Sequence, residues 1–235
     1  GALYVGPGCP QVKLSNCSFH GNVTLGSGGA IHLQSNADMV QCAFSANRAS
    51  ENGGAIEAFY RVDPNVASVL TVNLESCTFG GNLAVEGIYG QGGALHFEDV
   101  NAVLTDCYLI GNRAKSGGGL FQTSCTLKLK GGSVSNNIAI GGSGMSIQMS
   151  VNATSLVDLP RGNFRRENAG AGIDVGGGIV CAGANAMIEN CAFTHNSASG
   201  VRGGGGAISF YGGTVDHLVR NCLFTENSAK RDGGA

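Results

Sequence analysis

Charged residues are few in this sequence, prolines are rare, and long hydrophobic runs are missing. Charged residues make up 13% of the 235 residues and the formal net charge is −2, so the charge does not favour nucleic acid or an anionic membrane as a partner. No apolar run approaches the roughly 20 residues that a membrane-spanning helix needs, so we expect no direct membrane insertion of this segment. The 4 prolines and 40 glycines show no Gly-X-Y period, which excludes a collagen triple helix.

Sequence patterns of metal sites and of common enzymes are missing too. The 9 cysteines and 5 histidines include no Cys-x-x-Cys pair and no Cys/His spacing typical of zinc. Aspartate and glutamate are scattered, without the clustered carboxylates that a glycosidase uses. We therefore expect no metal, no cofactor and no enzymatic activity.

What the sequence contains instead is a repeat. In the stretch from Leu74 to Ala84 an apolar residue is followed by Cys77, Phe79 and Asn82 at fixed spacing. Further copies of this frame start at Leu14, Met39, Leu104, Leu129, Leu159, Ile188 and Val219. The copy at Leu159 is degraded and has Gly162 in the Cys position. Self-similarity at a period of about 25 to 35 residues is typical of a solenoid.

A second motif, Gly-Gly-Ala followed by an apolar-x-apolar alternation, comes between the copies of the first. It occupies residues 28–33 and recurs at 53–58, 92–97, 117–122, 176–181 and 205–210, with a looser copy at 142–147. Two glycines before alternating apolar residues predict a tight turn that leads into a short strand. One coil therefore holds at least two short strands and buries its apolar side only when coils stack.

The two motifs predict an all-β chain, a single β-helix (β-solenoid) domain spanning residues 1–235 with about eight coils. Both ends of the sequence interrupt a repeat, because Gly1-Ala2 and Gly233-Gly234-Ala235 are partial copies of the Gly-Gly-Ala motif. We therefore expect the chain to be an excerpt of a longer array, truncated within a repeat at both ends.

Two positions of the repeat are expected to form structural ladders from coil to coil. The Asn amide can both donate and accept, so stacked Asn side chains can bond to each other and to turn backbone. The inward Cys side chains are either stacked buried thiols or disulfides between adjacent coils, which a strand spacing of about 4.8 Å allows; we expect mostly reduced thiols. The ladder residues are Asn22, Asn47, Asn82, Asn112, Asn137, Asn196 and Asn227, with Cys17, Cys42, Cys77, Cys107, Cys191 and Cys222.

One outward column is a candidate functional site. His32, Glu57 and His96 come from successive coils and should stack about 5 Å apart, where imidazole and carboxylate can share a proton or a metal, with Glu98 beside them. We favour an exposed strand face with compatible charges; the alternative is a catalytic group. As candidate binding residues we single out Phe59, Glu98, Phe121 and Tyr211.

Three sequons are candidate glycosylation sites, at Asn16, Asn22 and Asn152. Asn22 belongs to the Asn ladder, so a glycan there would compete with its structural role. Asn152 lies in a long loop and is the better acceptor if the protein is secreted by a eukaryote.

The alternating Gly-Gly-Ala-(Ile/Leu) and Phe-x-x-Asn motifs resemble the repeats of chlamydial polymorphic outer membrane proteins, and similar repeats occur in large surface proteins of algae and other protists. The resemblance extends over the whole chain and implies a right-handed parallel β-helix of the pectin-lyase-like type, with three sheets along its length. For the bacterial family it implies adhesion and display at the cell surface, whereas the Cys-rich, sequon-bearing repeat favours a eukaryotic surface protein.

We therefore expect a structural or adhesive rod at the cell surface or outside the cell, part of a coat, matrix or filament. Its expected partners are other surface or matrix proteins, further copies of itself, or glycans. The alternative is a carbohydrate-active enzyme, a polysaccharide lyase or glycosidase, that uses the His32, Glu57 and His96 face. Fold by itself cannot decide between them, since β-helices carry both kinds of function.

Overall fold

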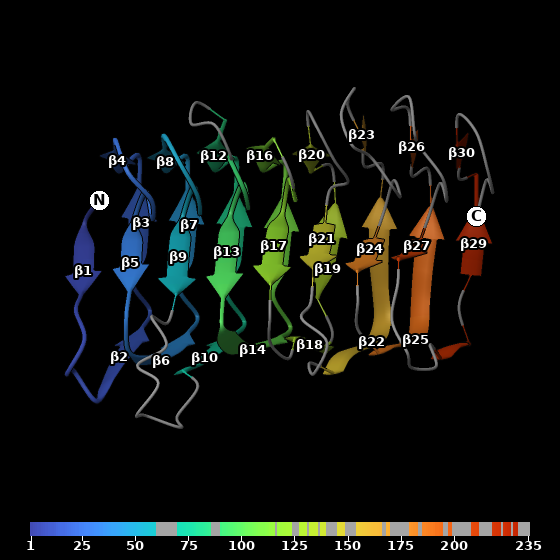
Figure 1. The fold of residues 1–235 in the computed structure, drawn as a ribbon, viewed down its shortest axis with the longest axis horizontal. Helices are drawn as coiled ribbons and strands as arrows, with labels where there is room; N and C mark the ends of the chain where they lie inside the picture. The colour runs from blue at the N-terminus through green and yellow to red at the C-terminus, as the bar shows by residue number, and fades with distance from the viewer. Residues whose placement is uncertain are drawn as a thin grey trace.

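The computed structural model describes most of the first half of the chain and the strands of the second half. The described residues are 1–59, 70–85, 90–115, 117–123, 127–130, 132–135, 137–139, 145–148, 154–165, 168–169, 179–182, 185–194, 197–198, 208–211, 218–221, 223–226 and 228–229. Coils follow one another along the longest axis, from β1 at one end to β30 at the other (Figure 1). No helix that could cross a membrane occurs within these residues.

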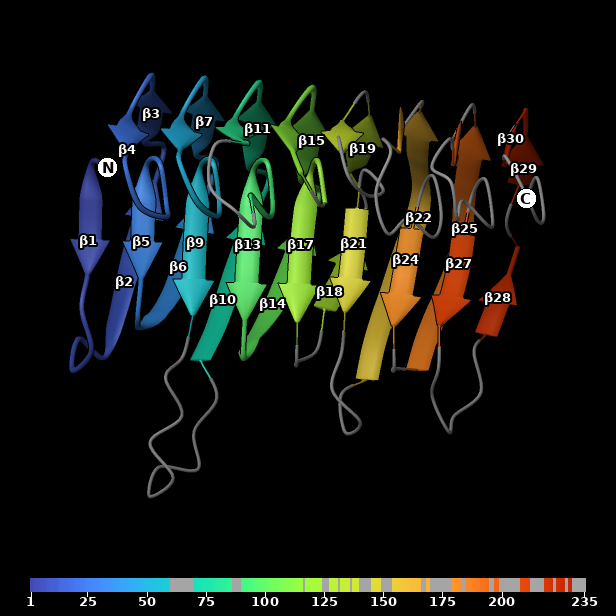
Figure 2. The same ribbon diagram turned by 45° about the horizontal axis from the view of Figure 1, so that its top comes forward.

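Sheet A is formed by the strands that follow the Gly-Gly motif, and it runs as one row along the rod (Figure 2). Its strands in spatial order are β1 (Leu3–Val5), β5 (Ile31–Leu33), β9 (Ile56–Phe59), β13 (Leu95–Glu98), β17 (Leu120–Thr123), β21 (Met145–Gln148), β24 (Ile179–Ala182) and β27 (Ile208–Tyr211).

Sheet B contains the strands on either side of the Cys position. Those before it are β2 (Gln11–Ser15), β6 (Asn36–Val40), β10 (Leu70–Glu75), β14 (Val100–Thr105), β18 (Leu127–Lys130) and β28 (Leu218–Arg220). Those after it are β3 (Ser18–His20), β7 (Ala43–Ser45), β11 (Thr78–Gly80), β15 (Tyr108–Ile110), β19 (Ser133–Ser135) and β29 (Leu223–Thr225). Two long strands, β22 (Thr154–Arg165) and β25 (Asn185–Thr194), span both sides and join them into one sheet.

Sheet C consists of two-residue strands that follow the Asn ladder. They are β4 (Val23–Thr24), β8 (Arg48–Ala49), β12 (Leu83–Ala84), β16 (Arg113–Ala114), β20 (Ile138–Ala139), β23 (Asn168–Ala169), β26 (Ser197–Ala198) and β30 (Ser228–Ala229). Adjacent coils pair in parallel in all three sheets. The parallel β-helix predicted from the repeats is therefore confirmed.

Strand pairing brings equivalent motif positions together. Leu74 pairs with Met39 and Leu104, and Phe79 with Phe44 and Leu109. The alignment predicted for the degraded copy is wrong by two residues, because Val157 rather than Leu159 pairs with Leu129 and Ile188. The register shifts between Asp158 and Gly162, so an irregularity in the strand absorbs the extra residues before the frame resumes.

The core is built from side chains that stack on their counterparts in the next coil. The rings of Phe19 and Phe44 lie 4.9 Å apart and those of Phe44 and Phe79 4.8 Å apart, within 5° of parallel. Phe44 and Phe79 are each 1% exposed. Leu33 and Ala58 of sheet A are also fully buried, so the apolar faces of the sheets meet in one continuous core.

The two glycines of the Gly-Gly motif have different tasks. Gly53 has a φ of +60°, which glycine adopts without the steric cost of a side chain, and it turns the chain back over β9. The φ of Gly54 is not positive, but a Cβ there would lie 2.1 Å from the carbonyl oxygen of Gly93. Gly53 therefore makes the turn, and Gly54 lets two coils approach closely.

Candidate functional site

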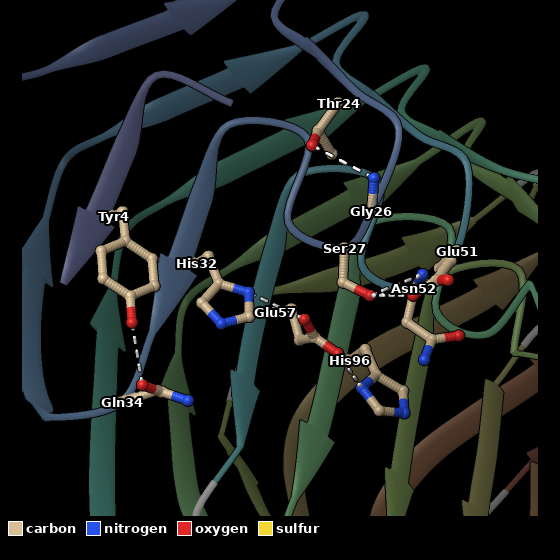
Figure 3. Close-up of polar contacts among 10 residues, drawn as sticks. All are labelled: Tyr4, Thr24, Gly26, Ser27, His32, Gln34, Glu51, Asn52, Glu57 and His96. Atoms are coloured by element: carbon tan, nitrogen blue, oxygen red, sulfur yellow. Dashed lines mark hydrogen bonds and ion pairs between the residues drawn. The ribbon is translucent and has the colours of Figure 1, made fainter. Parts of the chain in front are cut away.

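The candidate site on sheet A is a column of three polar side chains from successive coils. Strand pairing places His32 on β5 opposite Glu57 on β9, and Glu57 opposite His96 on β13. The Nδ1 atom of His32 lies 2.9 Å from Oε2 of Glu57, and Nδ1 of His96 lies 3.5 Å from Oε1 (Figure 3). One carboxylate thus faces a different imidazole with each of its oxygens.

This column is largely buried, although alternation along the strands directs it away from the core. Glu57 is 6% exposed and His96 is 2% exposed, while the His32 side chain keeps 23% of its surface. The exposed strand face favoured from the sequence is therefore wrong for these residues. The physical reason lies in the contacts of the column itself, because its side chains pack on one another and on the rings of Tyr4, Phe59 and Phe121.

Aromatic rings close the column at both ends. Tyr4 stacks on His32 with ring centres 5.4 Å apart, and Phe121 stacks on His96 at 5.5 Å. Both pairs are within 17° of parallel. Phe121 is buried and limits the access of water at the His96 end, which strengthens electrostatic interactions there. Tyr4 at the other end is 65% exposed.

The electrostatics of Glu57 follow from this enclosure. Burial by itself would raise the pKa of Glu57, but polar contacts with His32 and His96 and the attraction of the two imidazoles outweigh burial and lower that pKa from 4.5 to about 2. The contact with His96, at 3.5 Å, is an ion pair only when that imidazole is protonated, and its Nδ1 makes no regular hydrogen bond among the described residues. The carboxylate is thus held ionised between two imidazoles, with a shorter contact to His32 than to His96.

A hollow of about 390 Å³ borders the column at the first coil. Its lining includes Tyr4, His32, Thr24 and Ser27, and the Tyr4 hydroxyl donates a hydrogen bond of 3.1 Å to Oε1 of Gln34. An imidazole oriented by a carboxylate beside such a hollow can accept or donate a proton. Within the described residues no group of three or more His, Cys, Asp or Glu side chains could hold a metal ion.

The predicted binding residues are placed differently from one another. Glu98 is exposed and Phe59 is half-buried, with its ring edge-on to His32 at 5.3 Å. Phe121 is 4% exposed, so the expectation that it offers a binding surface is wrong, because its ring packs on His96 under the turn. Tyr211 lies in β27, but its side chain is outside the described part of the structure.

The Asn ladder connects successive coils through every amide from Asn22 to Asn137. The Oδ1 atom of Asn82 accepts from both the backbone and the side-chain nitrogen of Asn47, each at 3.0 Å. The Nδ2 atom of Asn82 in turn donates to Oδ1 of Asn112 and to the carbonyl of Phe44, also at 3.0 Å. Asn47, Asn82 and Asn112 are at most 1% exposed, so the ladder satisfies turn backbone that would otherwise be buried unpaired. Asn196 and Asn227 lie outside the described residues.

The cysteine column contains free thiols in the described residues. Cys42, Cys77 and Cys107 are buried, Cys17 is half-buried, and Cys9 is exposed. The Cys107 thiol beside Cys77 lowers the pKa of Cys77 to about 7, whereas the same interaction and burial raise the pKa of Cys107. Cys191 lies in β25, where only the backbone is described, and Cys222 is outside the described residues.

We expect these thiols to be reduced and protected. Iodoacetamide applied without reductant should label Cys9 in the folded protein, because it is exposed, and Cys42, Cys77 and Cys107 only after denaturation. Intact-mass measurement before and after denaturation counts the labels. If most of the column stayed unlabelled in denaturant, its cysteines would be bridged as disulfides.

The sequons differ in how free their acceptor nitrogen is. Asn16 is exposed and has a φ of +53° at the turn between β2 and β3. Asn22 is engaged in the ladder, since its Nδ2 donates to Oδ1 of Asn47 at 2.9 Å. Asn152 is outside the described residues. Among the sequons that the structure describes, Asn16 therefore offers the freer amide.

Comparison with known proteins agrees with the repeat. The model of the Chlamydia polymorphic membrane protein repeat matches residues 16–34, which run from the turn before Cys17 through the Gly-Gly motif into β5. A protein named "Probable outer membrane protein PmpG", from Chlamydia muridarum (strain MoPn / Nigg), is 33% identical over 115 residues. The match covers 46% of this chain and 12% of that much longer protein. No solved structure matches the chain.

Proposed function

We propose that this chain, which is built of Pmp-type repeats, is a rigid segment of a cell-surface protein with a structural or adhesive role. The observation that carries the proposal is the continuous stack of coils. Eight strands of sheet A at a spacing of about 4.8 Å give a rod on the order of 40 Å long. The Asn ladder connects successive coils from Asn22 to Asn137, and the stacked Phe rings connect those of Phe19, Phe44 and Phe79. Such a rod holds its outer faces in a fixed array.

The outer faces favour contact with other proteins or glycans over contact with strongly charged partners. Charged residues are only 13% of the sequence, and outward positions of sheet B include Ser18, Ala43, Thr78 and the partly exposed Tyr108 and Ile110. Such surfaces lose little hydration when they are covered. Other surface or matrix proteins, further copies of the chain, and glycans are the partners we propose.

Location and role can be tested separately. Protease treatment of intact cells that carry the natural full-length protein should release peptides of residues 1–235 before any cytoplasmic marker. Protection of these peptides until the cells lyse would contradict the surface location. For the adhesive role, beads coated with the folded chain should bind either to one another or to a glycan array. Beads coated with heat-unfolded chain are the control and should bind less in the same assay. Equal binding by folded and unfolded chain would contradict that role.

A second candidate function is a carbohydrate-active enzyme. The observation that favours it is the His32 imidazole, which Glu57 orients beside the hollow of about 390 Å³. Release of reducing ends or unsaturated sugars from acidic and neutral polysaccharides would support it, provided that His32→Ala abolishes the release. Absence of turnover with both classes of polysaccharide would remove the candidate.

A further inference from the structure

Buried histidine creates a problem for a protein that meets acid. An ordinary imidazole takes up a proton near pH 6.5, and a protonated imidazole without water or a counter-charge is costly. His96 is 2% exposed, and Phe121 covers one of its ring faces. A protein with such a residue normally becomes less stable as the pH falls below the titration of imidazole.

The surroundings of the column contain one counter-charge for this proton. The groups paired with the Glu57 carboxylate are His32 from β5 and His96 from β13. Around them lie the Tyr4 ring from β1, the half-buried Phe59 ring from β9 and the Phe121 ring from β17. Two further carboxylates are near this face and both are exposed. Glu98 is two positions along β13 from His96, and Glu51 accepts a hydrogen bond from Ser27 in the turn region.

We propose that the His32–Glu57–His96 column is an acid-tolerance device, in which the Glu57 carboxylate lets the buried imidazoles take up protons while the three coils stay stacked. One oxygen of Glu57 faces each imidazole, so its single negative charge balances one protonated imidazole, and the second positive charge falls on a column in which the His32 side chain keeps 23% of its surface. The device extends the proposed surface role, because it concerns the conditions under which this part of the rod stays folded.

The direction of the pH dependence follows from the carboxylate. The folded-state pKa of Glu57 is lowered from 4.5 to about 2, so its contribution to stability is fully present above about pH 4.5. That contribution is lost only as the pH falls from 4.5 toward 2. Because the carboxylate remains ionised throughout the range in which imidazoles become protonated, the counter-charge is present when it is needed.

The test compares acid unfolding of the full chain with that of two column variants and a matched control. Intrinsic fluorescence and circular dichroism are followed from pH 8 to pH 2. In Glu57→Gln the carboxylate is gone and both imidazoles remain, so the acid-unfolding midpoint should move up by about 1 to 2 pH units. Glu98→Gln removes an exposed carboxylate from the same face and should leave the midpoint within about 0.3 pH unit of the unmodified chain.

A double variant separates loss of the counter-charge from loss of packing. Glu57→Gln combined with His96→Leu removes the most buried imidazole as well, and it should bring the midpoint back toward that of the unmodified chain. The proposal would be overturned if Glu57→Gln had the same acid-unfolding midpoint as the unmodified chain. It would also be overturned if the double variant unfolded at the same pH as Glu57→Gln. If Glu57→Gln does not fold at pH 7, the double variant decides: folding with restored acid tolerance supports the proposal, and failure to fold overturns it.

Discussion

Gly54→Ala is expected to lower the free energy of unfolding by at least about 3 kcal/mol. The added Cβ would lie 2.1 Å from the carbonyl oxygen of Gly93 and 2.6 Å from the backbone nitrogen of Leu83. Neither backbone atom can move aside cheaply. The backbone nitrogen of Leu83 donates a hydrogen bond to the carbonyl of Asn47, and the backbone nitrogen of Gly54 donates one to the carbonyl of Gly92. Making room for one methyl group therefore means separating two coils.

Gly80→Ala is the matched control for this substitution. A Cβ on Gly80 would meet no atom within 4 Å, and its φ is not positive, so we expect a change within about 0.5 kcal/mol. Urea denaturation of both variants, followed by circular dichroism, measures the difference. Similar stabilities for Gly54→Ala and Gly80→Ala would mean that the coils do not approach as closely at the Gly-Gly turns as the structure has them.

The fold could be predicted from the sequence because each coil places the same residue types at the same positions of the repeat. Spacing between Phe79, Asn82 and Ala84 is repeated in the neighbouring coils, and parallel pairing with equivalent residues keeps those side chains in register. Stacking of like on like then follows from geometry. For this reason the Asn ladder, the Phe stack and the inward cysteines could be identified without coordinates.

The character of the candidate site could not be predicted in the same way. Alternation along a strand tells which side of the sheet a residue faces, and it placed His32, Glu57 and His96 together outside the core. It does not tell how far neighbouring side chains cover that side, and here Glu57 is 6% exposed and His96 is 2% exposed. The column was therefore expected to be exposed, whereas the structure buries most of it, and the two imidazoles lower the pKa of Glu57 against the effect of that burial.

The degraded repeat illustrates a second limit. Spacing alone located an apolar residue three positions before Gly162, which is Leu159. In the structure the equivalent residue is Val157, because the register shifts before Gly162. An irregularity inside a strand changes the count of residues without changing the residue types on either side, so only strand pairing reveals where the extra residues lie.

Asn82 lies in the middle of the described ladder and makes polar contacts with the coils on both sides. Its side chain accepts two hydrogen bonds from Asn47 and donates one each to Phe44 and Asn112, all at 3.0 Å. Asn82 is 1% exposed and Asn47 is fully buried. Water therefore cannot replace these partners when the Asn82 amide is removed.

Asn82→Ala is accordingly expected to cost about 3 to 5 kcal/mol of unfolding free energy. It removes the acceptor of the Asn47 backbone nitrogen and the side-chain donor to the Phe44 carbonyl. It also removes one of the two acceptors of the Asn47 side-chain nitrogen, which keeps only its bond to the Phe19 carbonyl. Asn82→Asp should be no more stable than Asn82→Ala, because a carboxylate can accept from Asn47 but cannot donate to Asn112, and its charge would be buried.

Asn73→Ala is the control for these substitutions. Asn73 is exposed and its Nδ2 donates to Asp38, so its loss should cost less than about 0.5 kcal/mol. Urea denaturation ranks the three variants. Equal stabilities of Asn82→Ala and Asn73→Ala would show that the ladder does not hold the coils together, and that packing of the Phe stack and the Gly-Gly turns alone does so.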